Sequence, residues 1–122
     1  MKRFCLSLFI LFVLLTIPNQ SNANTTQELL DQKDLYDSFI SLLDPYASKE
    51  IHKRYPNRSY GLYDVEVKSI QRSVDGEYTF KVTVIYKTYE GPHNPPYGIE
   101  TLTFMVSVGN VELLHYKHED VT

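Results

Sequence analysis

Apolar residues recur at three- and four-residue steps over residues 27–43 and 45–54, and this spacing predicts two helices. The apolar stripe of the first helix is predicted to contain Leu29, Leu35, Tyr36, Phe39, Ile40, Leu42 and Leu43. Proline disfavours helical geometry in the residue before it but suits the first position of a new helix, so Asp44-Pro45 should separate the two. Asp44 is therefore predicted to cap the second helix after a sharp bend. The inward residues of that helix are predicted to be Tyr46, Ile51 and Tyr55.

From residue 60 onward the period of the pattern changes to two, which predicts half-buried strands. Four strands are expected, near residues 63–70, 78–86, 102–108 and 111–118, with a bulge at Ser69-Ile70 in the first. Asp75-Gly76 and Gly109-Asn110 are predicted turns between strands. The residues expected to point inward are Tyr63, Val65, Val67, Ile70, Tyr78, Phe80, Val82, Val84, Tyr86, Leu102, Phe104, Val106 and Val108.

Helices followed by turn-linked strands predict an α+β fold, with N-terminal helices packed on a curved four-stranded antiparallel meander sheet. Phe80 is expected to face the helix stripe that contains Phe39, within this core. By analogy of fold alone, the arrangement is close to the cystatin-like and nuclear-transport-factor-like folds. A fold of this kind does not fix a function.

The first residues predict export from the cell. A positively charged start precedes an apolar run over residues 4–17, and the small residues Ser21-Asn22-Ala23 follow it. This is the layout of a secretory signal peptide that is cleaved after Ala23. A membrane anchor is the alternative, but a spanning helix needs about 20 apolar residues. We therefore expect a signal peptide over residues 1–23 and a single α+β domain over residues 24–122, secreted or held in the cell envelope without stable membrane insertion.

Cysteine content and charge narrow the classes of function. The only cysteine, Cys5, lies in the predicted signal peptide, so the remaining chain has no disulfide and no thiol nucleophile. Removing Lys2 and Arg3 leaves ten of the 12 basic residues against 15 acidic ones, a formal charge of −5. Nucleic acid is not an expected partner, because its binding needs basic residues concentrated on one face. The sequence also has no Gly-x-Ser-x-Gly motif and no phosphate-binding glycine loop, and no cofactor is predicted.

Residues 90–98, Glu-Gly-Pro-His-Asn-Pro-Pro-Tyr-Gly, form the most distinctive stretch of the sequence. The stretch is longer than the usual hairpin loop of about 2–5 residues, and its three prolines each fix a backbone angle. We predict a stiff, preshaped protrusion with His93 and Asn94 near its tip and Tyr89 and Tyr97 at its base. Preorganisation lowers the ordering cost of binding, which gives a reason for such a loop. The alternative is a structural role, in which the prolines protect a sheet edge or cap the core.

The predicted binding residues are Tyr89, Glu90, His93, Asn94, Tyr97 and His118. His118 could meet His93 or Glu90 across the sheet edge, whereas His115 should point to the other face of its strand. General acid–base chemistry by His93 with Glu90 is conceivable, since both lie on one loop. The histidines form no close cluster in the sequence, so no metal site is predicted.

Three stretches resemble a known family: Leu42-Leu43-Asp44-Pro45-Tyr46, residues 88–98, and Tyr116-Lys117-His118. The sequence is similar to short exported proteins of spore-forming Gram-positive bacteria, which are classed only as a domain of unknown function. The central stretch, with its Glu-Gly-Pro-His-Asn-Pro-Pro-Tyr-Gly loop, is the specific part of the resemblance. The resemblance implies an exported protein without an assigned activity, and it supplies no catalytic residues.

Two classes of function remain open. The first is a non-catalytic binding or inhibitory module that presents residues 90–98 to an envelope or extracellular partner, which would be a protein, a peptide or a cell-wall component. The second is a small enzyme or ligand carrier with a pocket between the helix and the concave sheet. Small size, the missing nucleophile and the stiff loop favour the first. Buried polar groups that converge on the concave face would favour the second.

Processing of the chain is testable directly. Because the apolar run is short and small residues follow it, the secreted form should begin at Asn24. Intact-mass analysis of the protein recovered from the culture or the envelope measures this. A chain that still begins at Met1 would show that the signal assignment is wrong.

Overall fold

The computed structural model of the protein describes residues 21–122. Helix α2 (Ser21–Arg54) begins in a unit that ends at Tyr36, and Asp37–Thr122 form a second unit, which holds the sheet, the core and both candidate sites. In the part of the chain that is described, no helix is long and apolar enough to cross a membrane. The predicted signal peptide lies almost wholly outside the described residues, and its cleavage stays a prediction.

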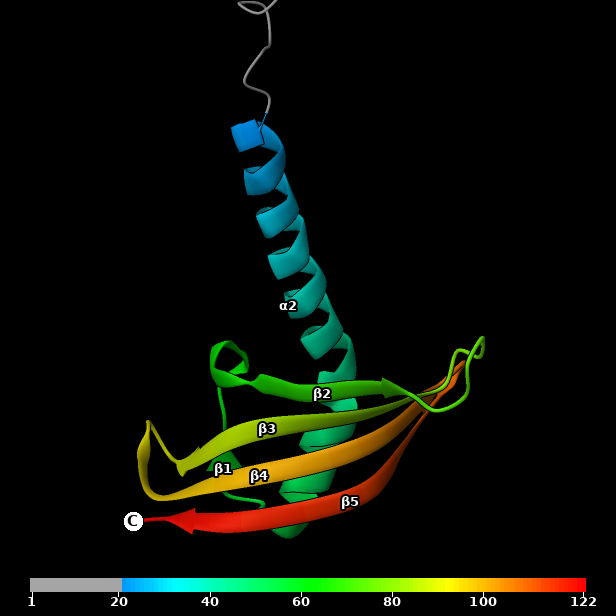
Figure 1. Cartoon of the computed structure of the whole chain (residues 1–122). Coiled ribbons are helices and arrows are strands. Elements are labelled where there is room, and N and C mark those ends of the chain that lie inside the picture. The colour runs from blue at the N-terminus through cyan, green and yellow to red at the C-terminus, as the bar shows by residue number, and fades with distance from the viewer. Residues whose placement is uncertain (1–20) are drawn as a thin grey trace, which may run out of the picture. The chain divides into compact units, whose positions relative to one another are not determined.

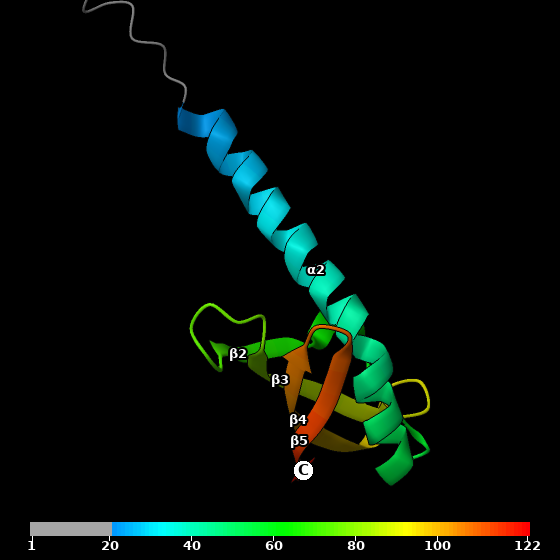
Figure 2. The ribbon, with the colours of Figure 1, turned by 90° about the vertical axis from the view of Figure 1, so that its right-hand side faces the viewer.

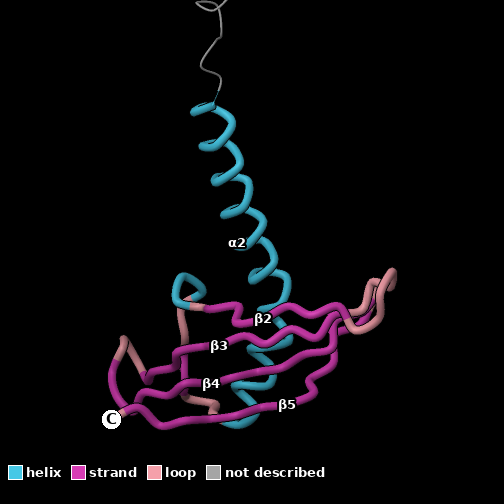
Figure 3. The backbone as a smooth tube through the Cα atoms, viewed as in Figure 1, coloured by secondary structure: helices cyan, strands magenta, loops and turns pink. Residues whose placement is uncertain are grey.

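The second unit combines the last part of α2 with an open antiparallel sheet (Figure 1). Its other elements are β1 (Arg58–Ser59), the short 3₁₀ helix η1 (Leu62–Asp64), β2 (Glu66–Arg72), β3 (Phe80–Glu90), β4 (Asn94–Ser107) and β5 (Asn110–Val121). Strands β3, β4 and β5 pair in sequence order, while β1 and β2 pair with different parts of β3. Short loops join the three long strands, as Figure 3 shows. The predicted α+β fold with an antiparallel meander is confirmed, with β1 as an additional fifth strand.

The core lies between α2 and the face of the sheet that it covers (Figure 2). Ile40, Leu43, Ala47 and Ile51 recur at three- and four-residue steps, which places them on one face of the helix. The buried residues opposite them are Val65, Val82, Val84, Tyr86, Leu102 and Phe104. Phe80, which was predicted to face the helix stripe that contains Phe39, is only partly buried, as is Phe39, and both pack against this cluster.

The prediction of two helices with a sharp bend is wrong, because α2 continues through Pro45 to Arg54. Proline removes one helical hydrogen bond, but Leu43, Ala47 and Ile51 keep the buried face of the helix continuous across it. Packing on the sheet therefore outweighs the local cost of the proline. Asp44 caps no second helix; its carboxylate instead accepts a hydrogen bond of 2.6 Å from the Tyr60 hydroxyl.

Several residues that were predicted to face inward are exposed: Leu35, Tyr36, Leu42, Tyr46, Tyr63, Ile70, Tyr78 and Val108. Tyr78 and Val108 lie just outside β3 and β4, so the two-residue period of those strands does not extend to them. Tyr63 belongs to η1 rather than to a strand. The predicted bulge near Ser69 is confirmed by a register shift between Val67 and Ser69, but it leaves Ile70 exposed.

The nine-residue loop predicted over residues 90–98 is also wrong in its extent. Strand β3 runs to Glu90 and β4 begins at Asn94, so the turn spans three residues that end at His93. Pro95 and Pro96 lie inside β4, before Tyr97, where its pairing with β5 begins. A proline is tolerated there because no neighbouring strand needs its missing N–H. Pro95 and Pro96 therefore extend the hairpin rather than form its loop.

Phe104 offers a test of this core, since its side chain is fully buried between sheet and helix. Phe104→Ala should lower the free energy of unfolding by about 3–5 kcal/mol, because it leaves a cavity that the surroundings fill only in part. Tyr78→Ala, at a position that is 73% exposed, is the matched control and should change stability by less than about 0.5 kcal/mol. Urea unfolding of both variants measures the difference. Equal midpoints for Phe104→Ala and the parent would contradict the observed core.

Candidate functional site

Functional candidates lie on both faces of the sheet near the β3–β4 turn. Successive residues of a strand point to opposite faces, so Thr88 faces the helix side while its neighbour Tyr89 faces the other side. The same alternation separates Glu100 from Ile99 on β4. One face carries a buried polar cluster around Glu100, and the other carries an open hollow.

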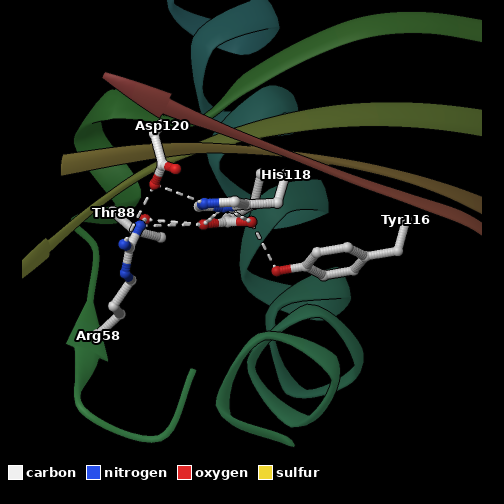
Figure 4. A network of polar contacts seen from close by, with 6 residues as sticks. Arg58, Thr88, Tyr116, His118 and Asp120 are labelled. Atoms are coloured by element: carbon white, nitrogen blue, oxygen red, sulfur yellow. Dashed lines mark hydrogen bonds and ion pairs between the residues drawn. The ribbon is translucent and has the colours of Figure 1, made fainter. Parts of the chain in front are cut away.

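Glu100 has no exposed surface, and its carboxyl group is held by three neighbours (Figure 4). Thr88 Oγ1 donates a hydrogen bond of 3.0 Å to Oε1, and the Tyr116 hydroxyl donates one of 2.7 Å to Oε2. His118 Nδ1 lies 2.8 and 2.9 Å from the two oxygens. The neighbours come from β3 and β5, so the carboxyl group connects β4 to the strand on each side.

Arg58 joins this cluster from the short strand β1 and is only 7% exposed. Its Nη1 donates to Thr88 Oγ1 at 3.3 Å and lies 3.6 Å from Glu100 Oε1. Asp120 closes the cluster on the outside, 3.8 Å from Arg58 Nη2 and 2.9 Å from His118 Nε2. Four strands thus meet through one connected set of polar side chains, which we call the Glu100 cluster: Arg58, Thr88, Glu100, Tyr116, His118 and Asp120.

Gly98 supplies the space in which the Glu100 cluster fits. A Cβ atom at this position would collide with the Arg58 guanidinium group, and would lie 2.8 Å from Thr88 Oγ1 and 2.9 Å from Glu100 Oε1. Atoms in a folded protein do not approach a Cβ so closely, so any side chain here would displace the buried charges. This close approach accounts for the glycine.

Burial and hydrogen bonds shift the pKa values of two residues of the cluster. Burial raises the pKa of Tyr116, and the hydrogen bond to Glu100 raises it further. For His118, desolvation lowers the pKa, but hydrogen bonds to Asp120 and Glu100 outweigh it and leave the pKa above 6.5. The Tyr55 ring lies 4.5 Å from the His118 ring and 4.9 Å from the Arg58 guanidinium carbon. The two ring nitrogens of His118 thus each face a carboxyl group, and both contacts favour the protonated ring.

Buried polar groups therefore do converge on the helix side, which was the expected mark of an enzyme or ligand carrier. They bond to one another, however. A hollow on the helix side near Tyr46, Phe104 and Leu113 measures only about 60 Å³, roughly the share of liquid volume of two water molecules. Residues 21–122 contain no group of three or more histidine, cysteine, aspartate or glutamate side chains that could hold a metal ion. The geometry of the Glu100 cluster thus serves to hold strands together.

The opposite face carries a larger hollow of about 410 Å³, a size typical of small-molecule sites, which span about 300–1,000 Å³. Its lining comes from η1, β3, the β3–β4 turn, β4 and the end of β5, and consists of Tyr63, Asp64, Lys87, Thr88, Tyr89, His93, Tyr97, Gly98, Ile99 and Val121. We call this the aromatic hollow. Its surface is mostly apolar, and its one ion pair joins Lys87 Nζ to Asp64 Oδ1 at 3.0 Å.

Three of the sequence-predicted binding residues meet at the aromatic hollow. The His93 ring lies 4.0 Å from the Tyr89 ring, and the Tyr97 hydroxyl donates a hydrogen bond of 2.9 Å to the His93 carbonyl. His93 has a φ of 68°, a left-handed conformation that is uncommon outside glycine. Glu90 and Asn94 stand opposite each other where the turn leaves the strands. The turn is thus fixed from both sides by its tyrosines.

His118 does not meet His93 or Glu90, as the sequence had suggested it could. It pairs with Glu100 in register and lies on the helix side of the sheet, whereas His115 pairs with Thr103 and is exposed. No hydrogen bond or ion pair between described residues joins His93 to Glu90. The predicted binding residues therefore divide between the two faces.

Sequence reasoning missed most of the Glu100 cluster, although one signal was present. Glu100 continues the two-residue alternation of Leu102 and Phe104 toward the N-terminus of β4, so the strand phase itself points it into the core. Arg58 and Asp120 carry no comparable signal, because their approach depends on how distant segments pair. The same holds for Tyr63 and Lys87 at the aromatic hollow.

The raised pKa of His118 predicts a pH-dependent stability. A folded-state pKa above the unfolded value adds stability that is fully present below about pH 6.5. This stability is lost as pH rises through the folded-state value. The stability advantage of the parent over His118→Gln should therefore shrink as pH rises, as urea unfolding from about pH 5 to above pH 8 would measure. His115→Gln is the control, and its free energy of unfolding should vary with pH as that of the parent does. If His118→Gln also showed the pH dependence of the parent, His118 would not be the source of that dependence.

Comparison with known proteins places the chain in a family. A family model described as "Protein of unknown function (DUF3888)" matches residues 35–120. This range includes the buried face of α2, the Glu100 cluster and all of the aromatic hollow except Val121. No curated protein and no solved structure matches the chain significantly, so the analogy to cystatin-like folds stays a prediction. Since the match covers more than half of the sequence, the chain belongs to the DUF3888 family of proteins of unknown function.

Proposed function

We propose that the protein is an exported, non-catalytic binding module whose binding site is the aromatic hollow beside the β3–β4 turn. The observation that carries this proposal is the hollow itself, with its three tyrosines and a histidine around about 410 Å³. Export is supported by the N-terminal sequence, so the partner is a component of the cell envelope or the surroundings of the cell. The β3–β4 turn supplies one rim of the site.

The aromatic side chains of the hollow are suited to binding. Tyr63 is 80% exposed and Tyr97 is 40% exposed, so both present ring surface to the solvent. Tyrosine combines a broad apolar face with a polar tip and loses few rotatable bonds on binding. Because Tyr89 stacks on His93, this rim is already ordered before a partner arrives, which lowers the cost of association.

The enzymatic alternative has weaker support. His93 lies in the lining, but general acid–base catalysis needs a second group that orients or relays the proton. Its ring stacks on Tyr89, and no described carboxylate bonds to it. The His118–Glu100 pair has the right residue types, yet it is enclosed by its own partners on the other face. Binding without chemistry therefore fits the aromatic hollow best.

Retention of envelope material tests the proposal. Protein expressed from the full-length sequence is immobilised, and an envelope fraction of the producing cells is passed over it. Tyr63→Ala should remove a bound component that the parent retains, since the variant deletes an exposed ring of the hollow without touching the core. His93→Ala with Asn94→Ala should weaken retention as well, because it alters the rim.

Tyr78→Ala is the matched control, because Tyr78 is an exposed tyrosine at the opposite end of β3 from the hollow. It should retain the same component as the parent. Equal retention by the parent, Tyr63→Ala and the turn variant would refute a binding role for the hollow. Circular dichroism of each variant verifies that the fold is intact.

A further inference from the structure

We infer that the aromatic hollow binds a neutral saccharide chain, stacked on its tyrosine rings. This inference rests on the proposed function and names the class of ligand that the same site takes. Three features carry it: the balance of charge in the lining, the chemistry of the exposed rings, and the pairing of the strands around the hollow.

Charge in the hollow favours an uncharged ligand. The lining contains one ammonium group, on Lys87, and one carboxylate, on Asp64, and they form an ion pair of 3.0 Å. An anionic ligand would compete with the Asp64 carboxylate for Lys87, and a cationic one would compete with Lys87 for Asp64, so the pair offers no net charge to either. A neutral ligand leaves it intact, and sugar hydroxyls can both donate to the carboxylate and accept from the ammonium group.

The rings favour a ligand with an apolar face and polar edges. A pyranose ring has this shape, because its C–H bonds form flat faces while its hydroxyls project from the rim. Tyr63, Tyr89 and Tyr97 offer apolar ring faces of matching character. Within residues 21–122, no hydrogen bond occupies the hydroxyls of Tyr63 and Tyr89, so both are available to a ligand, whereas the Tyr97 hydroxyl is bound to the His93 carbonyl.

One of the rings is also held in place before binding. Tyr63 is exposed, and Gly61 only leaves room for its ring: a Cβ atom on Gly61 would lie 2.7 and 2.8 Å from two of the ring atoms. On the other side of the hollow, Tyr89 is stacked on His93 at 4.0 Å. Stacking surfaces that are fixed in advance spare the ligand the cost of ordering them.

Strand pairing argues against a peptide that binds as an added strand. Such peptides bind to an unpaired sheet edge through main-chain hydrogen bonds. Here Tyr89 pairs with Ser59 of β1, and Tyr97 pairs with Val121 of β5, so the backbone beneath these two rings is already paired with a neighbouring strand. A ligand that stacks on these rings therefore lies on the surface of the sheet.

Titration with defined oligosaccharides tests the inference. The probes are tetra-N-acetylchitotetraose and cellotetraose, both neutral, and tetragalacturonate, an anionic chain of the same length. Two-dimensional NMR of the full-length protein measures binding. At least one neutral probe should bind and shift the resonances of Tyr63, Tyr89 and Ile99. Tyr63→Ala should weaken this binding about tenfold, the loss expected from one stacking contact, and Tyr78→Ala should leave it unchanged.

Other outcomes would overturn the inference. These are no binding of either neutral probe at millimolar concentration, binding that is indifferent to Tyr63→Ala, or tighter binding of tetragalacturonate than of the neutral chains. If both neutral probes fail while the envelope component is still lost in Tyr63→Ala, the hollow is a binding site for another class of ligand. The proposed function then stands and the saccharide inference falls. If the envelope component is also indifferent to Tyr63→Ala, both fail.

Discussion

A carboxyl group buried among apolar side chains must find hydrogen-bond donors, and this requirement at Glu100 organises the sheet. Removing such a group from water costs several kcal/mol unless its oxygens are bonded. The donors lie on β3 and β5, the strands that flank Glu100 on β4, and Arg58 approaches from β1. Glu100 can therefore be buried only when these strands pair in the correct register. A strand that slipped by one residue would turn its donors to the wrong face.

The Glu100 cluster and the aromatic hollow share one stretch of backbone. Thr88 and Tyr89 are neighbours on β3, and Gly98 and Tyr97 are neighbours on β4. In each pair one residue therefore faces the helix side of the sheet and the other faces the opposite side. Hydrogen bonds that fix the inner residues also fix the direction of the outer ones. The polar cluster thus holds the floor of the hollow rigid, which links the stability of the sheet to the shape of its binding surface.

The Glu100 cluster also links the last strand of a small domain to the rest of its sheet without a covalent bond. The only cysteine of the sequence lies in the predicted signal peptide, and small exported domains commonly rely on disulfides. Here the last strand is joined to the others through Tyr116, His118 and Asp120. His118 bonds to a carboxyl group through each of its ring nitrogens, so this link between strands contains a titratable group, which a disulfide lacks.

The sequence by itself determined the class of fold, since a three-to-four period followed by a two-residue period specifies helix and then strands regardless of context. It also predicted that Tyr89, His93 and Tyr97 lie together around one turn, because they are close in the chain. The continuity of α2 through Pro45 was decided by tertiary packing, since burial of Ala47 and Ile51 outweighs one lost helical hydrogen bond. The length of the β3–β4 turn was likewise decided by strand pairing, which draws Pro95 and Pro96 into β4. Two features depend on residues that are far apart in the sequence: the contacts among Arg58, Glu100 and His118, and the hollow between Tyr63 and Tyr97. Only the register of the folded strands brings such residues together.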